Sequence, residues 1–129
     1  MIPSAENSET SRVRFIEHKG KSVLLQDYSG LQPGPEFAGL IQRARTLIDG
    51  QPLHSVLTLV DASNSVFDSE VLAIMKDFVK RNTPYILYTV VVGITGLKEV
   101  GLMAVSRVAG RPLQTFSTRD EALDHLVEL

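Results

Sequence analysis

Hydrophobic positions in the first part of the chain predict a hairpin followed by a helix. Apolar residues alternate with polar ones around Val13 and Phe15 and again around Val23 and Leu25, on either side of a glycine-containing turn. This alternation is typical of a β-hairpin. A stretch rich in Gly and Pro, residues 28–35, then interrupts the strand pattern. The apolar residues that follow recur at helical spacing and predict one buried helix face: Phe37, Leu40, Ile41, Ala44, Leu47 and Ile48.

Strands and helices alternate through the rest of the chain. Short runs rich in β-branched residues predict strands, and these cover residues 55–60, 85–93 and 113–116. Amphipathic segments predict helices, and these cover residues 69–81 and 97–109. The last helix is expected to begin at Thr118, which forms a capping-box pattern with Glu121. The longest apolar run, residues 85–94, is about half as long as a membrane-spanning helix needs.

These elements give the order β-β-α-β-α-β-α-β-α. Strands alternating with helices predict right-handed crossovers and therefore a mostly parallel sheet, to which the N-terminal hairpin adds an antiparallel pair. We expect a single mixed α/β domain with four helices over residues 11–129, preceded by a loose arm over residues 1–10. A chain of 129 residues buries enough surface for one core without a metal or a disulfide.

Composition narrows the classes of function. The chain has no Cys, which excludes thiol nucleophiles, zinc knuckles and iron–sulfur ligation. His18, His54 and His125 lack paired ligand spacing, so we expect no metal and no cofactor. The formal net charge of −2 argues against nucleic acid as a partner. The first residues lack an export pattern, so a cytoplasmic protein is expected, and no catalytic grouping is recognisable. Binding is therefore favoured over catalysis.

The densest polar cluster follows the strand at 55–60 and leads into the next helix. Its side chains are Asp61, Ser63, Asp68, Ser69 and Glu70. Because sites in open α/β sheets gather at the carboxyl ends of strands, this cluster is a candidate surface for a protein partner. The simpler interpretation is that Asp68 or Ser69 caps the helix and that Glu70 is an acidic residue of the first turn.

The same segment resembles the phosphorylation-site region of STAS domains, in which an Asp-Ser-Ser-Gly-Leu-type motif starts a helix. Here the segment is Phe67-Asp68-Ser69-Glu70-Val71-Leu72. The whole stretch 12–129 is similar to the SpoIIAA-like (STAS/Sec14-like) branch of that superfamily, whose members mostly have no assigned function. The run of valines that ends at Gly93, followed by a helix and by the ending Phe116-x-Thr-x-x-Glu-Ala-Leu123, suggests this branch.

The segment departs from the family motif in a way that bears on regulation. The usual phosphoacceptor position falls on Glu70, which cannot be phosphorylated, and the Gly-Leu pair becomes Val71-Leu72. Glu70 either imitates a phosphorylated state or serves the helix dipole. Ser69 is a candidate acceptor one position earlier. The resemblance therefore implies the fold more strongly than it implies regulation by phosphorylation.

The loop 93–96 and the helix that follows it form the second candidate surface. Thr95 and Gly96 precede a helix start, where backbone amides could hold a ligand oxygen, although such a loop also serves as a tight turn. In the helix, Leu97, Val100, Gly101, Ala104, Val105 and Val108 are expected to form the core face. Leu102 and Met103 lie about 140° and 240° around the helix from Leu97. These two extra apolar residues predict either a homodimer surface or a pocket for an apolar ligand. The simpler interpretation is that helix termini or loops cover them.

Two functions follow. The first is a regulatory binding protein that contacts a protein partner through the strand-end surface around residues 61–70. The alternative is a carrier of a lipid or another apolar small molecule, held beside the helix at 97–109.

Overall fold

The computed structural model describes residues 11–110 and 113–129. The predicted arm at residues 1–10 lies outside the described residues. Strands β1 (Val13–His18) and β2 (Lys21–Asp27) form the expected antiparallel hairpin. Its two-residue turn places Lys19 and Gly20 at φ 51° and 82°, a backbone region that favours glycine. The hairpin prediction is therefore confirmed.

The remaining elements follow the predicted order. The helices are α2 (Pro35–Asp49), α3 (Ser69–Asn82), α4 (Lys98–Ala109) and α5 (Arg119–Glu128). The strands are β3 (Val56–Asp61), β4 (Ile86–Val92) and β5 (Gln114–Phe116). A short 3₁₀ turn, η1 (Thr83–Tyr85), follows α3 and contains Pro84, so β4 begins at Ile86, one residue after the start of the predicted strand at 85–93. Among the described residues, no helix is long and apolar enough to cross a membrane.

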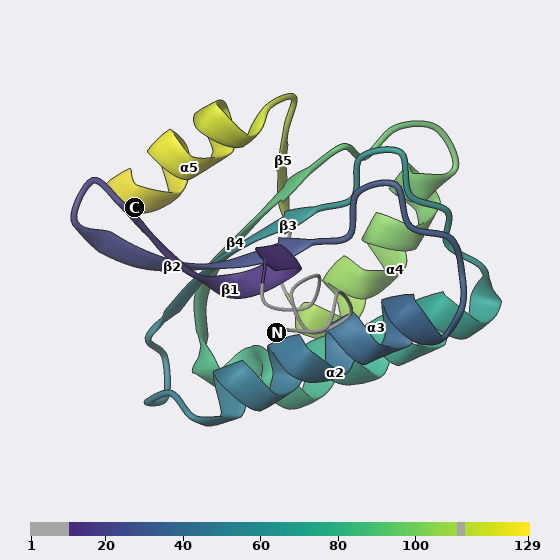
Figure 1. Cartoon of the computed structure of the whole chain (residues 1–129), viewed down its shortest axis with the longest axis horizontal. Helices are drawn as coiled ribbons and strands as arrows, with labels where there is room; N and C mark the ends of the chain where they lie inside the picture. The colour runs from purple at the N-terminus through teal and green to yellow at the C-terminus, as the bar shows by residue number, and fades with distance from the viewer. Residues whose placement is uncertain (1–10, 111–112) are drawn as a thin grey trace, which may run out of the picture.

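The five strands lie in the sheet in chain order, β1-β2-β3-β4-β5, and every pair after the hairpin is parallel. Figure 1 shows α2, α3 and α4 on one side of the sheet and α5 on the other. This arrangement confirms a single mixed α/β domain with an N-terminal hairpin. The carboxyl ends of the parallel strands meet at one end of the molecule, where the predicted candidate loops emerge.

The core has two parts, one on each face of the sheet. Beneath α2, α3 and α4 lies the larger cluster, which includes Leu24, Phe37, Ile48 and Val105. The smaller cluster lies between α5 and the opposite face and includes Leu59, Val90 and Leu126. Three buried polar side chains are linked by hydrogen bonds within the core. The Tyr28 hydroxyl donates to Gln26, and the Gln26 amide donates to Thr58, each over 2.8 Å.

The predicted core face of the helix at 97–109 is confirmed at Val105 but wrong at Leu97, Val100 and Val108. Leu97 and Val100 are 90% and 68% exposed, and Val108 is partly exposed as well. Val105 and Ala109 are buried. Leu102, which was expected outside the core face, lines the cavity between α4 and the sheet. The helix is rotated because it packs mainly on α3 and covers only the margin of the sheet. The helix does expose more apolar surface than one core face requires, and Leu97 and Val100 contribute most of it.

Candidate functional site

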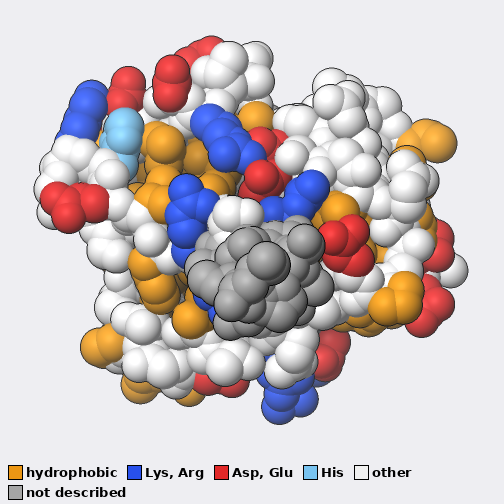
Figure 2. Space-filling model, in the orientation of Figure 1, with side chains coloured by type: hydrophobic (Ala, Val, Ile, Leu, Met, Phe, Trp, Pro, Cys, Tyr) orange, Lys and Arg blue, Asp and Glu red, His pale blue; other side chains and the backbone are white. Residues whose placement is uncertain are grey.

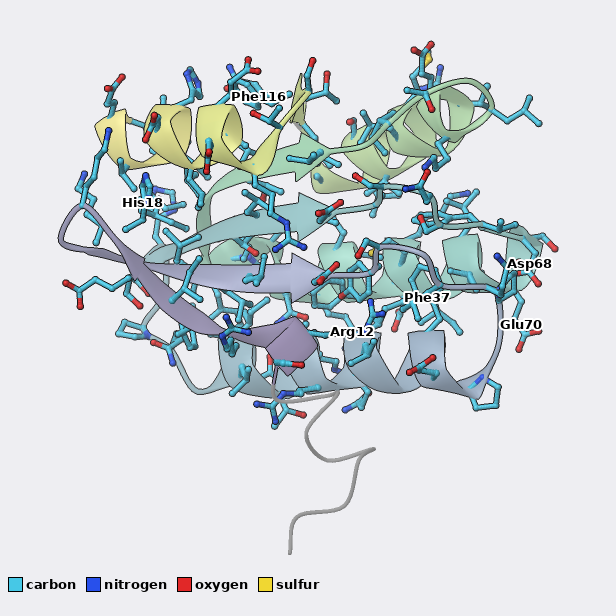
Figure 3. The ribbon with its side chains drawn as sticks, turned by 45° about the horizontal axis from the view of Figure 1, so that its top comes forward. Arg12, His18, Phe37, Asp68, Glu70 and Phe116 are labelled. Atoms are coloured by element: carbon cyan, nitrogen blue, oxygen red, sulfur yellow. The ribbon has the colours of Figure 1, made fainter. Side chains whose placement is uncertain are left out.

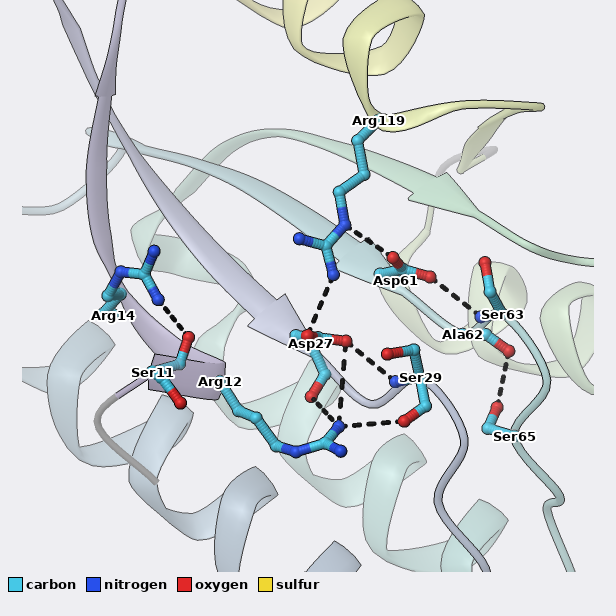
Figure 4. A network of polar contacts seen from close by, with 10 residues as sticks. All are labelled: Ser11, Arg12, Arg14, Asp27, Ser29, Asp61, Ala62, Ser63, Ser65 and Arg119. Atoms are coloured by element: carbon cyan, nitrogen blue, oxygen red, sulfur yellow. Dashed lines mark hydrogen bonds and ion pairs between the residues drawn. The ribbon is translucent and has the colours of Figure 1, made fainter. Parts of the chain in front are cut away.

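Charged side chains at the ends of β2 and β3 form a network with α5 (Figure 4). The guanidinium of Arg119 binds Asp27 through Nη2 at 2.9 Å and Asp61 through Nε at 2.7 Å. From the other side, Arg12 donates to the carbonyl oxygen of Ser29 at 2.9 Å. In Figure 2, acidic side chains lie between basic ones near the middle of this face. The network fixes where the two strands end relative to the last helix.

Each aspartate also holds the loop that follows its own strand. Asp27 accepts the backbone N–H of Ser29, and Asp61 accepts that of Ser63, both over 2.9 Å. Burial by itself raises the pKa of Asp27, but hydrogen bonds from Ser29 and the charge of Arg119 outweigh it and hold that pKa below its ordinary value. Asp27 is therefore ionised at neutral pH, and its carboxylate is held by Ser29 and Arg119.

The loop after Asp61 passes very close to the end of β4. Gly93 has φ 84°, and a Cβ atom at this position would overlap the backbone of Ser63. The Ala62 carbonyl accepts both the Ser65 hydroxyl at 2.6 Å and the Lys98 ammonium at 2.7 Å. The Lys98 contact ties the start of α4 to the loop that precedes α3.

A groove of about 570 Å³ lies between these two segments. One wall is formed by residues of the 65–72 segment and the other by residues of 95–101. Its lining residues are Ser65, Val66, Phe67, Asp68, Ser69, Leu72, Thr95, Leu97, Lys98, Val100 and Gly101. The groove thus joins the two loops that the sequence singled out separately.

The structure separates the predicted partner-binding residues into two groups. Asp61 is 5% exposed and belongs to the ion-pair network, and Ser63 is half-buried beside it. Asp68, Ser69 and Glu70 are exposed at the start of α3. Figure 3 shows Asp68 and Glu70 at the end of the molecule toward which the strands point, and His18 at the opposite end. Only the second group is exposed throughout.

Asp68 has the structural role that the simpler interpretation gave it. Its carboxylate accepts the backbone N–H of Val71 at 2.8 Å and caps α3, while Glu70 lies in the first helical turn. Asp68 and Ser69 nevertheless line the groove, so capping and an additional contact are compatible. Glu70 is exposed but is not a lining residue.

The second predicted surface is also divided. Thr95 is exposed and lines the groove, whereas Gly96 is exposed beside it. Met103 is 58% exposed on the outer side of α4. Leu102 instead lines a cavity between α4 and the sheet. Met103 and Leu102, which the sequence grouped as one surface, therefore lie on different sides of the helix.

Among residues 11–110 and 113–129, no group of three or more His, Asp or Glu side chains is placed to hold a metal ion. His18 donates a 2.8 Å hydrogen bond from Nε2 to the Asp124 carboxylate of α5. His125 packs against the ring of Phe116, with ring centroids 5.0 Å apart. Both histidines therefore contribute to the attachment of α5.

Comparison with known proteins identifies the fold. The chain is similar to a solved structure of an uncharacterized DUF3478-family protein with a SpoIIAA-like fold from Shewanella loihica PV-4. The TM-score is 0.71 and the sequence identity 11%, over 88% of this chain and 91% of that one. No family model and no curated protein matches the sequence. The SpoIIAA-like fold implied by the resemblance is therefore confirmed, at the level of the fold.

Sequence reasoning missed the pairing of Arg119 with Asp27. A usable signal was present, because Asp27-x-Ser29 and Asp61-x-Ser63 repeat one pattern at the ends of two strands that become neighbours. The pattern predicts paired Asx turns. The cation that joins them comes from a helix more than fifty residues later in the chain, beyond the reach of local patterns.

Proposed function

We propose that this protein acts by binding a segment of a partner protein in the groove between residues 65–72 and 95–101, rather than by catalysis. The observation that carries the proposal is the exposure of Leu97 and Val100, at 90% and 68%, on the wall of a groove. Neighbouring exposed apolar side chains on a folded domain mark surfaces that bind other molecules. Val66, which is 47% exposed, lies on the opposite wall.

Charge specifies the chemistry of the partner. Asp68, Glu70 and Glu99 are exposed acidic residues at or next to the groove. The cation among the lining residues is Lys98, whose ammonium is directed to the Ala62 carbonyl. A groove with apolar walls and acidic residues at its rim complements a segment that has apolar anchor residues flanked by Lys or Arg. Asp61 and Ser63 support this surface from behind by holding the loop.

Peptide display tests the proposal. A random 12-residue library is selected on the wild-type protein and counter-selected on a Leu97→Ser/Val100→Ser variant. Enriched peptides should carry two or three apolar residues with flanking Lys or Arg. The double substitution should weaken their binding at least about tenfold, because two apolar contacts are lost. The matched control is Tyr88→Ser, which removes a side chain 41% exposed on β4, outside the groove lining.

Three outcomes would overturn this assignment. Selected peptides could lack basic residues, bind the double variant equally well, or lose affinity equally with the Tyr88 control. A concentration-dependent rise in mass that the double substitution removes would identify a second copy of this chain as the occupant instead.

A further inference from the structure

A second, more enclosed hollow lies between the sheet and helices α3 and α4. It has a volume of about 80 Å³ and is lined mainly by apolar side chains, among them Phe78, Val91, Leu102 and Val105. It shares only Phe67, Lys98 and Gly101 with the lining of the groove. The cavity and the groove are therefore neighbouring hollows with mostly different linings.

One polar group of this lining has an unused hydrogen-bonding position. Asn82, the last residue of α3, is 1% exposed and lines the cavity. Its side-chain nitrogen Nδ2 donates to the Asp49 carboxylate at 2.9 Å. Its side-chain oxygen Oδ1 is buried and has no hydrogen-bond partner among the described residues. Because an ionised carboxylate only accepts, Asp49 fixes the amide orientation and leaves the oxygen as the free acceptor.

Neighbouring polar side chains do not satisfy this oxygen. Gln26 and Thr58 line the same cavity, but the Gln26 amide donates to the Thr58 hydroxyl, and that hydroxyl donates to the Leu24 carbonyl at 2.9 Å. The Thr83 hydroxyl donates to the Val79 carbonyl at 2.6 Å. A buried acceptor without a donor opposes folding. A molecule that brings one donor into an otherwise apolar space would relieve that penalty.

We propose that this cavity binds the end of an aliphatic molecule that carries a hydroxyl group, with the hydroxyl donating to Asn82 Oδ1. The volume is about half that of an engineered apolar cavity of about 150 Å³ that binds benzene. The enclosed part of the ligand is therefore small, on the order of three to five non-hydrogen atoms. It is either a short alcohol or the end of a longer one that extends past Phe67 and Gly101 into the groove.

This proposal goes beyond partner binding, and substitution of Asn82 tests it separately because Asn82 does not line the groove. The probes are 1-butanol and 1-chlorobutane, which have the same chain length and differ in the hydrogen-bond donor. Each is titrated against ¹⁵N-labelled protein, and binding is followed by amide chemical shifts. The variants are Asn82→Leu, which removes the acceptor, and Gln42→Leu, which removes an exposed amide on α2 as the matched control.

The expected result is selective for the alcohol. Asn82→Leu should weaken 1-butanol binding about five- to tenfold more than 1-chlorobutane binding, the size of one hydrogen bond, and Gln42→Leu should change neither. A cavity-filling variant, Ala109→Val, keeps Asn82 and should weaken the binding of both probes.

1-Octanol distinguishes a short alcohol from a longer one as the ligand. A longer alcohol is the ligand if 1-octanol binds more tightly and also shifts amides of residues 97–101, and a short alcohol is the ligand if 1-octanol fails to bind.

Two results would overturn the proposal. Equal weakening of both probes by Asn82→Leu would make the cavity merely apolar. Absence of saturable 1-butanol binding to the wild type would mean that the space is dry or holds only water. Neither result bears on the peptide selection, so the two proposals fail separately.

Discussion

Asp27 and Asp61 lie opposite each other in the parallel pairing of β2 with β3, and a single guanidinium, that of Arg119, binds both carboxylates. Two acidic groups at adjacent strand ends repel each other unless a cation lies between them. Arg119 provides that cation from the first turn of α5. One side chain therefore joins two strand ends to the helix that covers the second face of the sheet.

Removing this cation should destabilise the fold and reverse part of its pH dependence. Arg119→Met leaves Asp27 beside Asp61, whose side chain is 8% exposed, so we expect a loss of about 2–3 kcal/mol in the free energy of unfolding at pH 7. The variant should gain stability as the pH falls from 7 toward 4, because protonation of one carboxylate relieves the repulsion. Urea unfolding at several pH values measures both effects. Arg14→Met, which removes an exposed arginine on β1, is the control and should cost less than about 0.5 kcal/mol.

The lowered pKa of Asp27 predicts an acid-dependent contribution to stability. A carboxyl group whose pKa is lower in the folded state stabilises the fold above its unfolded pKa, about 3.9, and the contribution is lost as pH falls through the folded pKa. Asp27→Asn should cost about 1–2 kcal/mol at pH 7. The difference between wild type and variant should stay constant from pH 7 to about 5 and shrink toward zero below about pH 4. A difference that grows on acidification would contradict the ion pairing of Asp27.

Gly93 should tolerate no side chain. Gly93→Ala places a Cβ atom against the backbone of Ser63 and also strains a φ of 84°, so we expect a loss of about 2–4 kcal/mol. Gly39 in α2 is a matched control, since a Cβ atom there meets nothing within 4 Å. Gly39→Ala should raise stability by about 0.5–1 kcal/mol through helix propensity. Thermal unfolding of the two variants gives shifts of opposite sign if both assignments hold.

Substitutions at Asp68 separate its capping role from a role in recognition. Asn also caps helices, so Asp68→Asn should change stability by less than about 0.5 kcal/mol, whereas Asp68→Ala should cost about 1 kcal/mol. Both substitutions remove the charge, so both should weaken the binding of basic peptides. Unfolding and peptide titration are measured on the same samples. If Asp68→Ala weakens peptide binding and Asp68→Asn does not, Asp68 serves only as a helix cap.

The fold could be predicted because its determinants are local. Alternation around Val13 and Val23 specifies the hairpin, helical spacing from Phe37 specifies α2, and strands that alternate with helices require parallel pairing. Caps were equally readable: Asp68 caps α3, and the Thr118 hydroxyl accepts the backbone N–H of Glu121 at 3.2 Å. The Glu121 carboxylate lies 3.3 Å from that hydroxyl.

The orientation of α4 could not be predicted in the same way. Every turn of this helix contains an apolar residue, so the sequence does not determine which side faces the sheet. Packing against α3 decides, and it places Leu102 inside and Leu97 outside. Such a choice depends on contacts between elements, which periodicity does not encode.

Placement of the candidate site was only partly predictable for a related reason. Ligand crevices in doubly wound sheets lie where the strand order reverses, but these strands run in chain order without a reversal. The strand-end rule still led to Asp68, Ser69 and Thr95. It also included Asp61, which a distant arginine buries in an ion pair. The groove arises between two loops and not at a switch in the sheet.

The single-helix cover on one face of the sheet has a consequence for biosynthesis. Among the described elements, α5 alone packs over Val23, Leu59 and Val90, whereas α2, α3 and α4 cover the opposite face. Ribosomal synthesis proceeds from the N-terminus, so the elements that cover the first face leave the ribosome before residues 119–128. During that interval the second face exposes a band of valine and leucine to other nascent chains. Chaperone demand should therefore peak just before α5 emerges, and Arg119 then closes the structure at the ends of β2 and β3.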